Sequence, residues 1–190
     1  MMQESSKFLL FSGLSGVIIG IYALVGSFIA YKKIYTVGLF DNLFSYLIVP
    51  ELIVYGVLIF VISLLTVIIM TYRRIKKAGK KIWNPSSKLM LLNLSIPLLS
   101  GGAFILIFIE KGIYEVVSPA CLIFYGLALV NSAKFSRQEI FYMGLLEISL
   151  GILASLFLSI SLLFWAFGFG VIHIVYGLIM YFRYEYKTNE

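Results

Sequence analysis

Long uninterrupted runs of apolar residues dominate the chain and are separated by short polar or charged segments. Residues 52–70, for example, are apolar apart from Gly56, Ser63 and Thr66. A membrane β-barrel would instead show runs of roughly ten residues in which apolar and polar positions alternate. In lipid each backbone amide must be hydrogen-bonded within the protein, and a continuous apolar segment meets this demand as a helix. The pattern therefore predicts an all-α integral membrane protein.

Six segments are long enough to cross a membrane, which takes about 20 mainly apolar residues. They are residues 8–30, 43–72, 89–109, 114–133, 140–160 and 165–182. The first segment is longer than the roughly 7–15 apolar residues of a signal peptide, so we interpret it as an uncleaved span. We expect these segments to form one transmembrane domain over residues 1–190.

Three boundaries of these segments carry their own signals. Pro50 predicts a kink in the second segment, or a short interfacial helix ahead of the true span. The sequence Asn-Pro-Ser-Ser at 84–87 predicts the start of the third helix. The last two segments form one apolar stretch that is too long for a single crossing, so it must turn near Ser159, Ser161 and Trp165.

The composition excludes an ordinary soluble domain. Apolar residues make up 61% of the chain and charged residues 13%, whereas soluble domains are roughly 45–50% apolar and about 25% charged. In water this excess would leave large apolar patches on the surface. Lipid is therefore the expected solvent for most of the chain.

Lysine and arginine residues in the connecting segments orient the predicted helices, because these residues are enriched in cytoplasmic loops. With a cytoplasmic N-terminus, 12 of the 15 Lys and Arg residues lie inside, and the other 3 are Lys32, Lys33 and Lys111. The chain is therefore predicted to be a multi-pass protein of the cell inner (plasma) membrane with both termini in the cytoplasm.

The loop between the second and third segments is strongly basic. Its Lys and Arg residues are Arg73, Arg74, Lys76, Lys77, Lys80 and Lys81. Clusters of four to eight basic residues beside a span can bind anionic lipid headgroups, while the alternative is that the loop only fixes topology. We expect lipid partners here, and a protein partner or homo-oligomer as a further alternative. Nucleic acid is not expected as a partner, because one short loop at a membrane surface is poorly suited to bind in the groove of a nucleic acid.

An internal repeat is the most informative feature of the sequence. The second, fourth and sixth segments each contain a Tyr-Gly pair, namely Tyr55-Gly56, Tyr125-Gly126 and Tyr176-Gly177. In the odd-numbered segments Gly20, Gly101 and Gly151 match one another, and they precede the tyrosines by 35, 24 and 25 residues. We therefore expect three two-helix hairpins inserted the same way round, over approximately residues 7–83, 84–136 and 137–190.

The glycines are expected to bring helices together. Lipid tails are as apolar as leucine, so helices in a membrane associate where small residues allow close packing. Gly13, Gly16 and Gly20 lie on one side of the first segment, and Gly144 and Gly151 share a face of the fifth. The alternative is that these thin surfaces line a substrate path.

The last hairpin resembles a known family in residues 144–153, in Gly170 and in the Tyr-Gly-Leu-Ile sequence at 176–179. These positions are similar to one hairpin of the HdeD-like family of small bacterial membrane proteins. The resemblance covers about the last third of the chain and extends loosely to the rest. It implies six spans in three hairpins, with no established enzymatic mechanism. The basic loop and the long second segment depart from the family's pattern.

Two ionisable residues lie inside predicted spans, where charge is costly and a functional role is the first hypothesis. Glu147 lies ten residues after Arg137, and His173 lies ten residues before Arg183. Each is therefore ~15 Å from the cytoplasmic end of its helix. Adjacent antiparallel helices would bring the two side chains level, so that one proton could serve both. The sequence thus predicts a proton-sensitive or proton-carrying site, with Asn93 as a third polar candidate.

A structural role is the alternative for this pair. Neutral Glu147 and His173 would then hold the bundle in register by hydrogen bonds to each other or to one of three nearby polar residues. These are Asn93, Ser95 and Tyr142.

Patterns that support catalysis are missing from the sequence. There is one histidine and one cysteine, whereas a hydrolytic metal site generally needs three protein ligands. The metalloprotease, phosphate-loop and nucleophile-elbow patterns do not occur, and Cys121 in its apolar run is expected to be inert. We predict no enzyme, cofactor or metal. The leading hypothesis is a non-enzymatic sensor, regulator or accessory subunit, and the alternative is a small proton-linked transporter or channel that uses Glu147 and His173.

Overall fold

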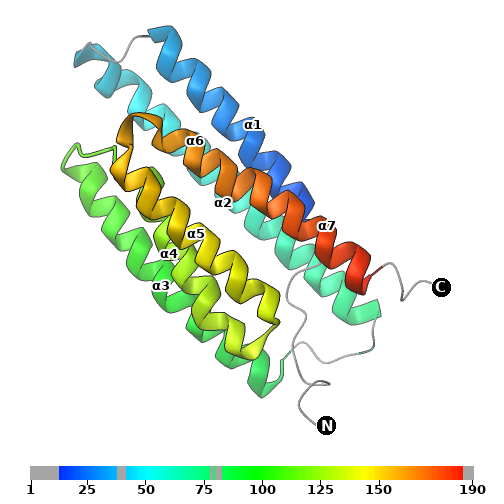
Figure 1. Cartoon of the computed structure of the whole chain (residues 1–190). Coiled ribbons are helices and arrows are strands. Elements are labelled where there is room, and N and C mark those ends of the chain that lie inside the picture. Colours follow the sequence, from blue (N-terminus) through cyan, green and yellow to red (C-terminus); the bar gives the residue numbers. More distant parts are fainter. Residues whose placement is uncertain (1–12, 38–41, 78, 80–82, 186–190) are drawn as a thin grey trace.

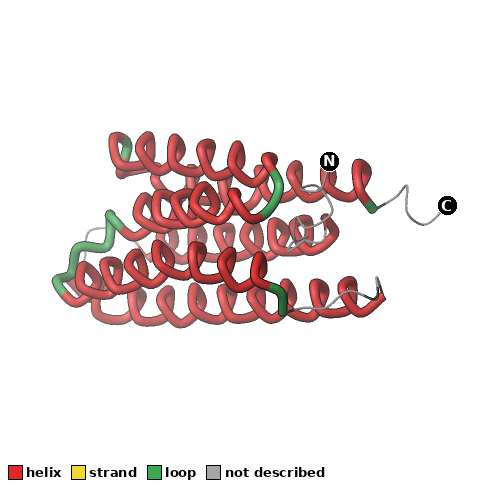
Figure 2. Tube along the Cα trace, turned by 90° about the horizontal axis from the view of Figure 1, so that it is seen from below, coloured by secondary structure: helices red, strands yellow, loops and turns green. Residues whose placement is uncertain are grey.

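The computed structural model is an all-helical bundle whose long helices run side by side (Figures 1 and 2). It describes residues 13–37, 42–77, 79 and 83–185, and this part of the chain contains no strand. Six helical segments in it are long and apolar enough to cross a membrane. They are Gly13–Ile34, Ile48–Lys77, Pro85–Glu110, Val117–Phe135, Gln138–Leu156 and Leu158–Tyr184. The predicted all-α class and the six segments are confirmed.

Each of the six candidate spans is called a crossing below, and the first five are each formed by one main helix. These are α1 (Gly13–Val37), α2 (Asn42–Lys77), α3 (Pro85–Glu110), α4 (Val117–Ser132) extended by the 3-10 turn η1 (Ala133–Phe135), and α5 (Gln138–Leu156). The sixth crossing is composite. It consists of the 3-10 turn η2 (Leu158–Ile160), α6 (Ser161–Ala166), the π-helix η3 (Phe167–Ile172) and α7 (His173–Tyr184).

The helix boundaries test the sequence signals directly. Asn84 caps α3: its side chain accepts a hydrogen bond from the Ser87 amide (2.8 Å), and Ser87 Oγ accepts one from the Asn84 amide (3.0 Å). The predicted helix start is therefore confirmed. The predicted turn in the last apolar stretch exists, but it lies earlier than expected: α5 ends at Leu156 and the 3-10 turn contains Ser159, whereas Ser161 begins α6 and Trp165 lies inside that helix.

Two boundary predictions have a different outcome. α2 runs as one helix through Pro50, so the alternative of a separate interfacial helix is wrong. The proline lies in the third turn of α2, and its ring removes one amide donor without ending the helix. Residues 8–12 of the predicted first span lie outside the described residues.

The bundle has a defined order of neighbours. α4 packs along both α3 and α5, and α1 packs along both α2 and the sixth crossing. The sixth crossing also contacts α4 and α5 and so joins the two halves. α2 and α3 are the outer members, and Figure 1 shows α3 at one edge of the bundle.

Two lines of contact, the α4–α5 seam and the α1–α7 seam, depend on glycine. A Cβ added at Gly126 would lie 2.6 Å from the Gly144 carbonyl oxygen, and one added at Gly144 would lie 2.7 Å from that of Gly126. Gly13 and Gly177 have the same relation, at 2.5 and 2.6 Å. Any larger side chain at these positions would separate the backbones, so glycine is what allows this close association.

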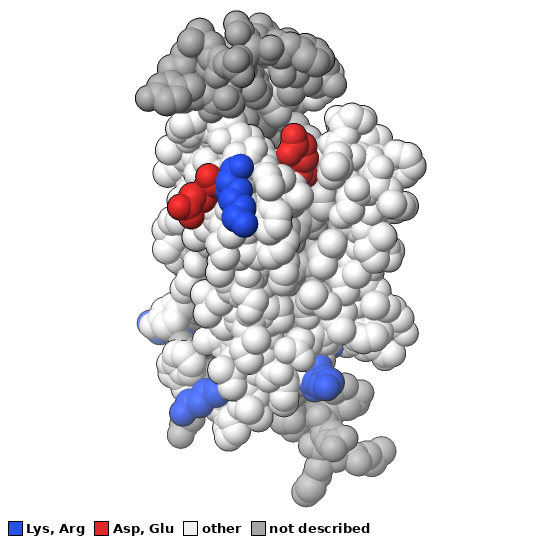
Figure 3. All heavy atoms as spheres, turned by 90° about the vertical axis from the view of Figure 1, so that its left-hand side faces the viewer, with Lys and Arg blue, Asp and Glu red and all other residues white. Residues whose placement is uncertain are grey.

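The surface agrees with a location in lipid. Figure 3 shows charged side chains near both ends of the visible face, with an uncharged belt between them. Many large apolar side chains are exposed on the molecule, and Leu99, Leu106 and Leu156 are each at least 65% exposed. Together with the six long apolar helices, this distribution suggests a multi-pass membrane protein.

Candidate functional site

Glu147 and His173, the two ionisable residues predicted to lie level with each other, meet in the interior. Glu147 projects from the middle of α5, and His173 is the first residue of α7. The His173 Nδ1 atom lies 3.6 Å from Glu147 Oε1. Glu147 is completely buried and His173 is 5% exposed. The contact therefore lies in the packed core of the bundle.

Tyr125 of α4 completes what we call the Glu147–His173–Tyr125 cluster. The tyrosine hydroxyl lies 2.8 Å from His173 Nε2, and His173 Nδ1 lies 3.0 Å from the Gly168 carbonyl oxygen. A carbonyl only accepts hydrogen bonds, so Nδ1 carries a hydrogen and donates it. Nε2 of the neutral ring then accepts the hydrogen bond of the Tyr125 hydroxyl. The two bonds fix the tautomer and the orientation of the imidazole.

The Glu147 carboxyl group is closely packed but poorly satisfied in hydrogen bonds. Neither of its oxygens has a hydrogen-bond partner among the described residues. A Cβ added at Gly168 would lie 2.5 Å from Glu147 Oε2, so the space for the carboxyl group depends on glycine at this position. A buried charge without a partner is costly, and the imidazole is the polar group placed to relieve this cost.

The π-helix η3 ends immediately before His173. Its sequence, Phe-Gly-Phe-Gly-Val-Ile, contains two glycines in the first four residues, and glycine lowers the preference for regular α-helix. Gly168 supplies the carbonyl that His173 Nδ1 bonds. Short π-helical segments are rare and frequently occur at functional sites. This irregular turn is therefore the second unusual feature of the cluster, after the buried carboxyl group.

Aromatic rings surround the imidazole. The Phe169 ring lies 5.6 Å from the His173 ring and 5.0 Å from that of Tyr125, measured between centroids. Trp165, one turn earlier, lies 5.0 Å from Phe169. These contacts give the cluster apolar surroundings. They also connect it to the Trp165 indole, whose fluorescence can report on it.

An apolar layer adjoins the cluster. Leu129 and Met143 are one turn beyond Tyr125 and one turn before Glu147, and they pack with Ile140. All three are at most 5% exposed, and Tyr176 packs against them. This layer lies between the cluster and the α4–α5 turn.

The far end of α7 is tied to three other helices. Glu139 of α5 accepts a hydrogen bond from the Tyr184 hydroxyl (2.6 Å) and pairs with Arg183 (3.1 Å). Glu185 pairs with Arg74 of α2 (2.9 Å) and accepts a hydrogen bond from the amide of Gly13 in α1 (2.6 Å). The helix that begins with His173 therefore ends in a polar network.

The remaining predicted residues lie away from the cluster. Asn93 bonds within α3, where its side chain donates to the Leu89 carbonyl (2.7 Å), and its own carbonyl accepts from Asn131 (3.0 Å). Tyr142 accepts a hydrogen bond from Gln138 on an exposed face. The structure thus brings together two of the three polar candidates.

The basic loop is described in part. Arg73, Lys76 and Lys77 are exposed, while Arg74 is paired with Glu185. Lys80 and Lys81 lie outside the described residues.

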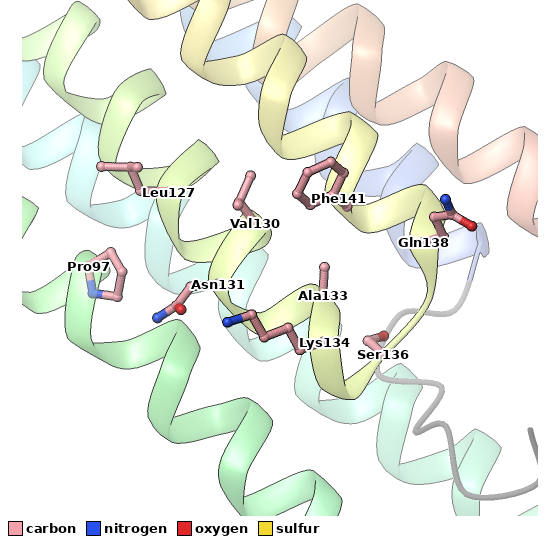
Figure 4. Close-up of a pocket in the computed structure, with 9 residues that line it drawn as sticks. All are labelled: Pro97, Leu127, Val130, Asn131, Ala133, Lys134, Ser136, Gln138 and Phe141. Carbon is pink, nitrogen blue, oxygen red and sulfur yellow. The ribbon is translucent and has the colours of Figure 1, made fainter. Parts of the chain in front are cut away.

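A separate groove of about 630 Å³ lies between α3, α4 and α5 (Figure 4). Its polar side chains include Asn131, Lys134 and Gln138, and its apolar wall is formed mainly by Leu127, Val130 and Phe141. A mixed lining of this kind suits an amphipathic molecule. The groove shares no residue with the cluster.

Among the described residues, no group of three or more His, Cys, Asp or Glu side chains is arranged to hold a metal ion. No protein-family model matches the chain, and no curated protein or solved structure matches it either. The resemblance of the last hairpin to the HdeD-like family therefore stays a prediction.

Proposed function

We propose that this protein is a non-enzymatic membrane sensor or regulator in which the Glu147–His173–Tyr125 cluster responds to protons. The observation that carries the proposal is the 3.6 Å contact between a fully buried carboxyl group and an imidazole. Because Glu147 is inaccessible and His173 nearly so, a substrate cannot reach the pair in this conformation. Sensing is better supported than catalysis for this reason.

The number of protons in the cluster controls its energy. With one exchangeable proton, the pair is either two neutral groups or an ion pair, and its net charge is zero. Loss of that proton leaves a carboxylate, and gain of a second leaves an imidazolium, in an apolar interior where a net charge is costly. A change of proton number would therefore favour a different packing of the sixth crossing.

The sixth crossing is suited to pass such a change to the cytoplasmic end. Its π-helix can exchange with regular α-helix by a local shift of hydrogen bonds, which makes it a candidate two-state element. α7 starts at His173, and Glu185, directly after its end, pairs with Arg74 at the start of the basic loop. Movement of α7 would thus alter the surface that carries Arg73, Lys76 and Lys77.

The proposed setting is the cell inner membrane, with both termini in the cytoplasm. The support is the distribution of 12 against 3 Lys and Arg residues between the two sides. Anionic lipid or a protein partner at the basic loop is the proposed output, supported by the exposure of Arg73, Lys76 and Lys77.

The three-hairpin repeat belongs to the same proposal. Its support is that Gly126 and Gly177, the glycines of the second and third Tyr-Gly pairs, each face a glycine of a following or preceding odd helix. Two such equal contacts fit hairpins inserted the same way round.

A proton-linked transporter is the alternative that uses the same residues. It needs a path for water, and the apolar layer of Leu129, Ile140 and Met143 beside the cluster favours the sensor. Reconstituted liposomes containing a pH-sensitive dye separate the two, because a transporter gives a proton flux that Glu147→Gln abolishes and a sensor gives none.

The fluorescence of Trp165 tests the sensor directly. Of the two tryptophans, Trp83 is replaced by phenylalanine, so that the indole near the cluster is the only one. In nanodiscs between about pH 5 and 8, where histidine normally titrates, we expect a spectral transition that disappears in Glu147→Gln. Glu110→Gln, a change at an exposed carboxyl group at the end of α3, is the matched control and keeps the transition. An identical transition in Glu147→Gln would refute the proposal.

A further inference from the structure

The α4–α5 seam has a register that can be stated in two contacts. Gly126 faces Gly144, as described above, and Ile123 faces Gly151, where an added Cβ would lie 2.5 Å from Ile123 Cγ1. Along α5, in an odd-numbered crossing, the two positions are seven residues apart, and along α4, in an even-numbered crossing, they are three apart. We call the residues that one helix contributes to a seam its half-seam. The half-seam of the even kind is Ile-x-x-Gly, and that of the odd kind is two small residues.

The α1–α7 seam repeats this register. Gly177 faces Gly13, and Ile174 faces Gly20, where an added Cβ would lie 2.6 Å from Ile174 Cγ1. Gly13 and Gly20 are again seven residues apart, and Ile174 and Gly177 again three. Two of the three contacts that a ring of three hairpins would contain are therefore closed in the same way.

α2 carries an uncovered half-seam of the even kind. Ile53 and Gly56 have the required spacing of three residues. A Cβ added at Gly56 would meet no atom within 4 Å, and Phe60, one turn further on, is 60% exposed. The glycine position that is buried at Gly126 and Gly177 is thus open at Gly56.

α3 carries an uncovered half-seam of the odd kind. Ser95 and Gly102 are seven residues apart, Gly102 has no atom within 4 Å of an added Cβ, and Leu99 between them is 73% exposed. Gly101, the glycine that the sequence matches to its counterparts in the other odd helices, packs instead on Phe124 of its own hairpin. The seam register would therefore use Gly102, one residue after the glycine that the sequence repeat matches.

One chain does not bring its own two half-seams together. α2 packs along α1, to which the Glu51–Lys33 ion pair ties it. Among the described residues, α2 approaches α3 through Ile75, which packs on Met90 near the basic loop. Both half-seams lie farther from the basic loop than this contact and remain uncovered.

We infer that a second copy of this chain covers both half-seams, so that α2 of each copy packs on α3 of the other. Each chain carries both complementary halves, which is what a two-fold symmetric dimer requires. α2 and α3 follow each other in the chain and cross in opposite directions, as α4 and α5 do, so the two copies would lie the same way round in the membrane. Neither half-seam contains a charged residue, so packing at small residues is the available driving force.

Cysteine cross-linking between tagged copies tests this inference. Cys121, the single cysteine, is first replaced by serine. Copies with Phe60→Cys and copies with Ser95→Cys, each with a different affinity tag, are then produced together and oxidised in native membranes. This pair corresponds to Val130 and Gly144, where an added Cβ lies 2.8 Å from the valine side chain. We expect a mixed disulfide-linked dimer.

Leu58→Cys with Ile96→Cys is the matched control, because both residues are exposed and lie at similar depths on other faces of α2 and α3. Cross-linking no stronger than in this control would overturn the inference. A single chain that carries both Phe60→Cys and Ser95→Cys provides a further test. If it forms an internal disulfide in place of a dimer, α2 closes on its own α3 and the inference is wrong.

Gly56→Leu supplies a second measurement. A leucine fits the single chain, since no atom lies within 4 Å of the added Cβ, but it would hold the two copies apart. We expect about a tenfold or greater loss of cross-linked dimer, with unchanged yield of folded monomer. An undiminished dimer in this variant would also overturn the inference.

Discussion

At the scale of single residues, the buried carboxyl group of Glu147 determines how the protein should respond to pH. The slope of unfolding free energy against pH follows the number of protons bound in the unfolded state minus the number bound in the native state. Above about pH 7.5 the unfolded chain carries no proton on Glu147 and few on His173, whereas we propose that the native cluster retains one. The native state then binds more protons, so stability falls as the pH rises, by up to about 1.4 kcal/mol per pH unit.

Glu147→Gln should remove this fall. The variant cluster carries no exchangeable proton, and above about pH 7.5 neither state of the variant changes its proton number appreciably at these two residues. Thermal unfolding in nanodiscs from pH 7.5 to 8.5 measures the difference, with Glu110→Gln as the control that keeps the wild-type slope. Parallel wild-type and Glu147→Gln curves would mean that the native cluster does not hold the proton.

Tyr125→Phe isolates one hydrogen bond of the cluster. The change removes the hydroxyl that bonds His173 Nε2 at 2.8 Å and leaves a buried ring nitrogen without a donor. We expect a loss of about 1–3 kcal/mol in unfolding free energy. Tyr142→Phe, which removes an exposed hydroxyl bonded to Gln138, should cost less than about 0.5 kcal/mol. Equal midpoints in thermal unfolding for the two variants would contradict a role for Tyr125 in holding the imidazole.

The sequence predicts part of this site and misses the rest for a physical reason. Counting residues from the ends of two helices is enough to bring Glu147 and His173 to one depth, because helix rise is constant. Which side chains surround them depends on how the helices are rotated and packed. That information is absent from a count of depth, so the pattern places Tyr125 only in the Tyr-Gly repeat and suggests Asn93, whose bonds lie within α3 and to Asn131.

At the scale of helices, the glycine seams make a contrast that can be measured. Gly144→Ala would bring its Cβ within 2.7 Å of the Gly126 carbonyl oxygen, so the helices must move apart or strain. We expect a cost of about 1–3 kcal/mol.

Gly102→Ala is the matched control for Gly144→Ala. No atom lies within 4 Å of its added Cβ, and alanine is about 1 kcal/mol better than glycine inside a helix. In detergent that separates copies, Gly102→Ala should therefore unfold at the same temperature as wild type or higher. A loss of stability as large as that of Gly144→Ala would show that α3 has neighbours there.

Helix boundaries were predictable where a single residue sets them. Asn84 caps α3 through bonds to its own neighbour Ser87, so no distant part of the chain is involved. The π-helix of residues 167–172 was not predictable in this way. Its two glycines also fit a regular α-helix with close neighbours, and the close approach of Gly168 to Glu147 is a contact that only the folded bundle supplies.

At the scale of the whole molecule, six helices of spanning length could be predicted because lipid imposes the same length and apolarity on each membrane-spanning helix. The open α2–α3 contact could not be predicted, since Gly56 has the same preceding tyrosine and the same isoleucine three residues earlier as Gly126 and Gly177. Similar local sequence with different burial indicates that the difference arises from which helices meet. The basic end of the molecule raises the same question, because a basic residue can serve the fold or a ligand.

Arg74 and its exposed neighbours separate these two roles. Arg74 pairs with Glu185, which also accepts the Gly13 amide hydrogen bond, so Arg74→Gln should lower thermal stability equally in nanodiscs of zwitterionic and of anionic lipid. Arg73, Lys76 and Lys77 are exposed, and each should contribute roughly 1 kcal/mol only when the membrane is anionic. Their combined replacement by glutamine should abolish most of the extra stability in anionic nanodiscs and leave the zwitterionic value unchanged. If anionic lipid stabilises that triple variant as much as wild type, lipid binding by these residues is excluded. The three side chains would then serve only to keep this end of the helices in the cytoplasm.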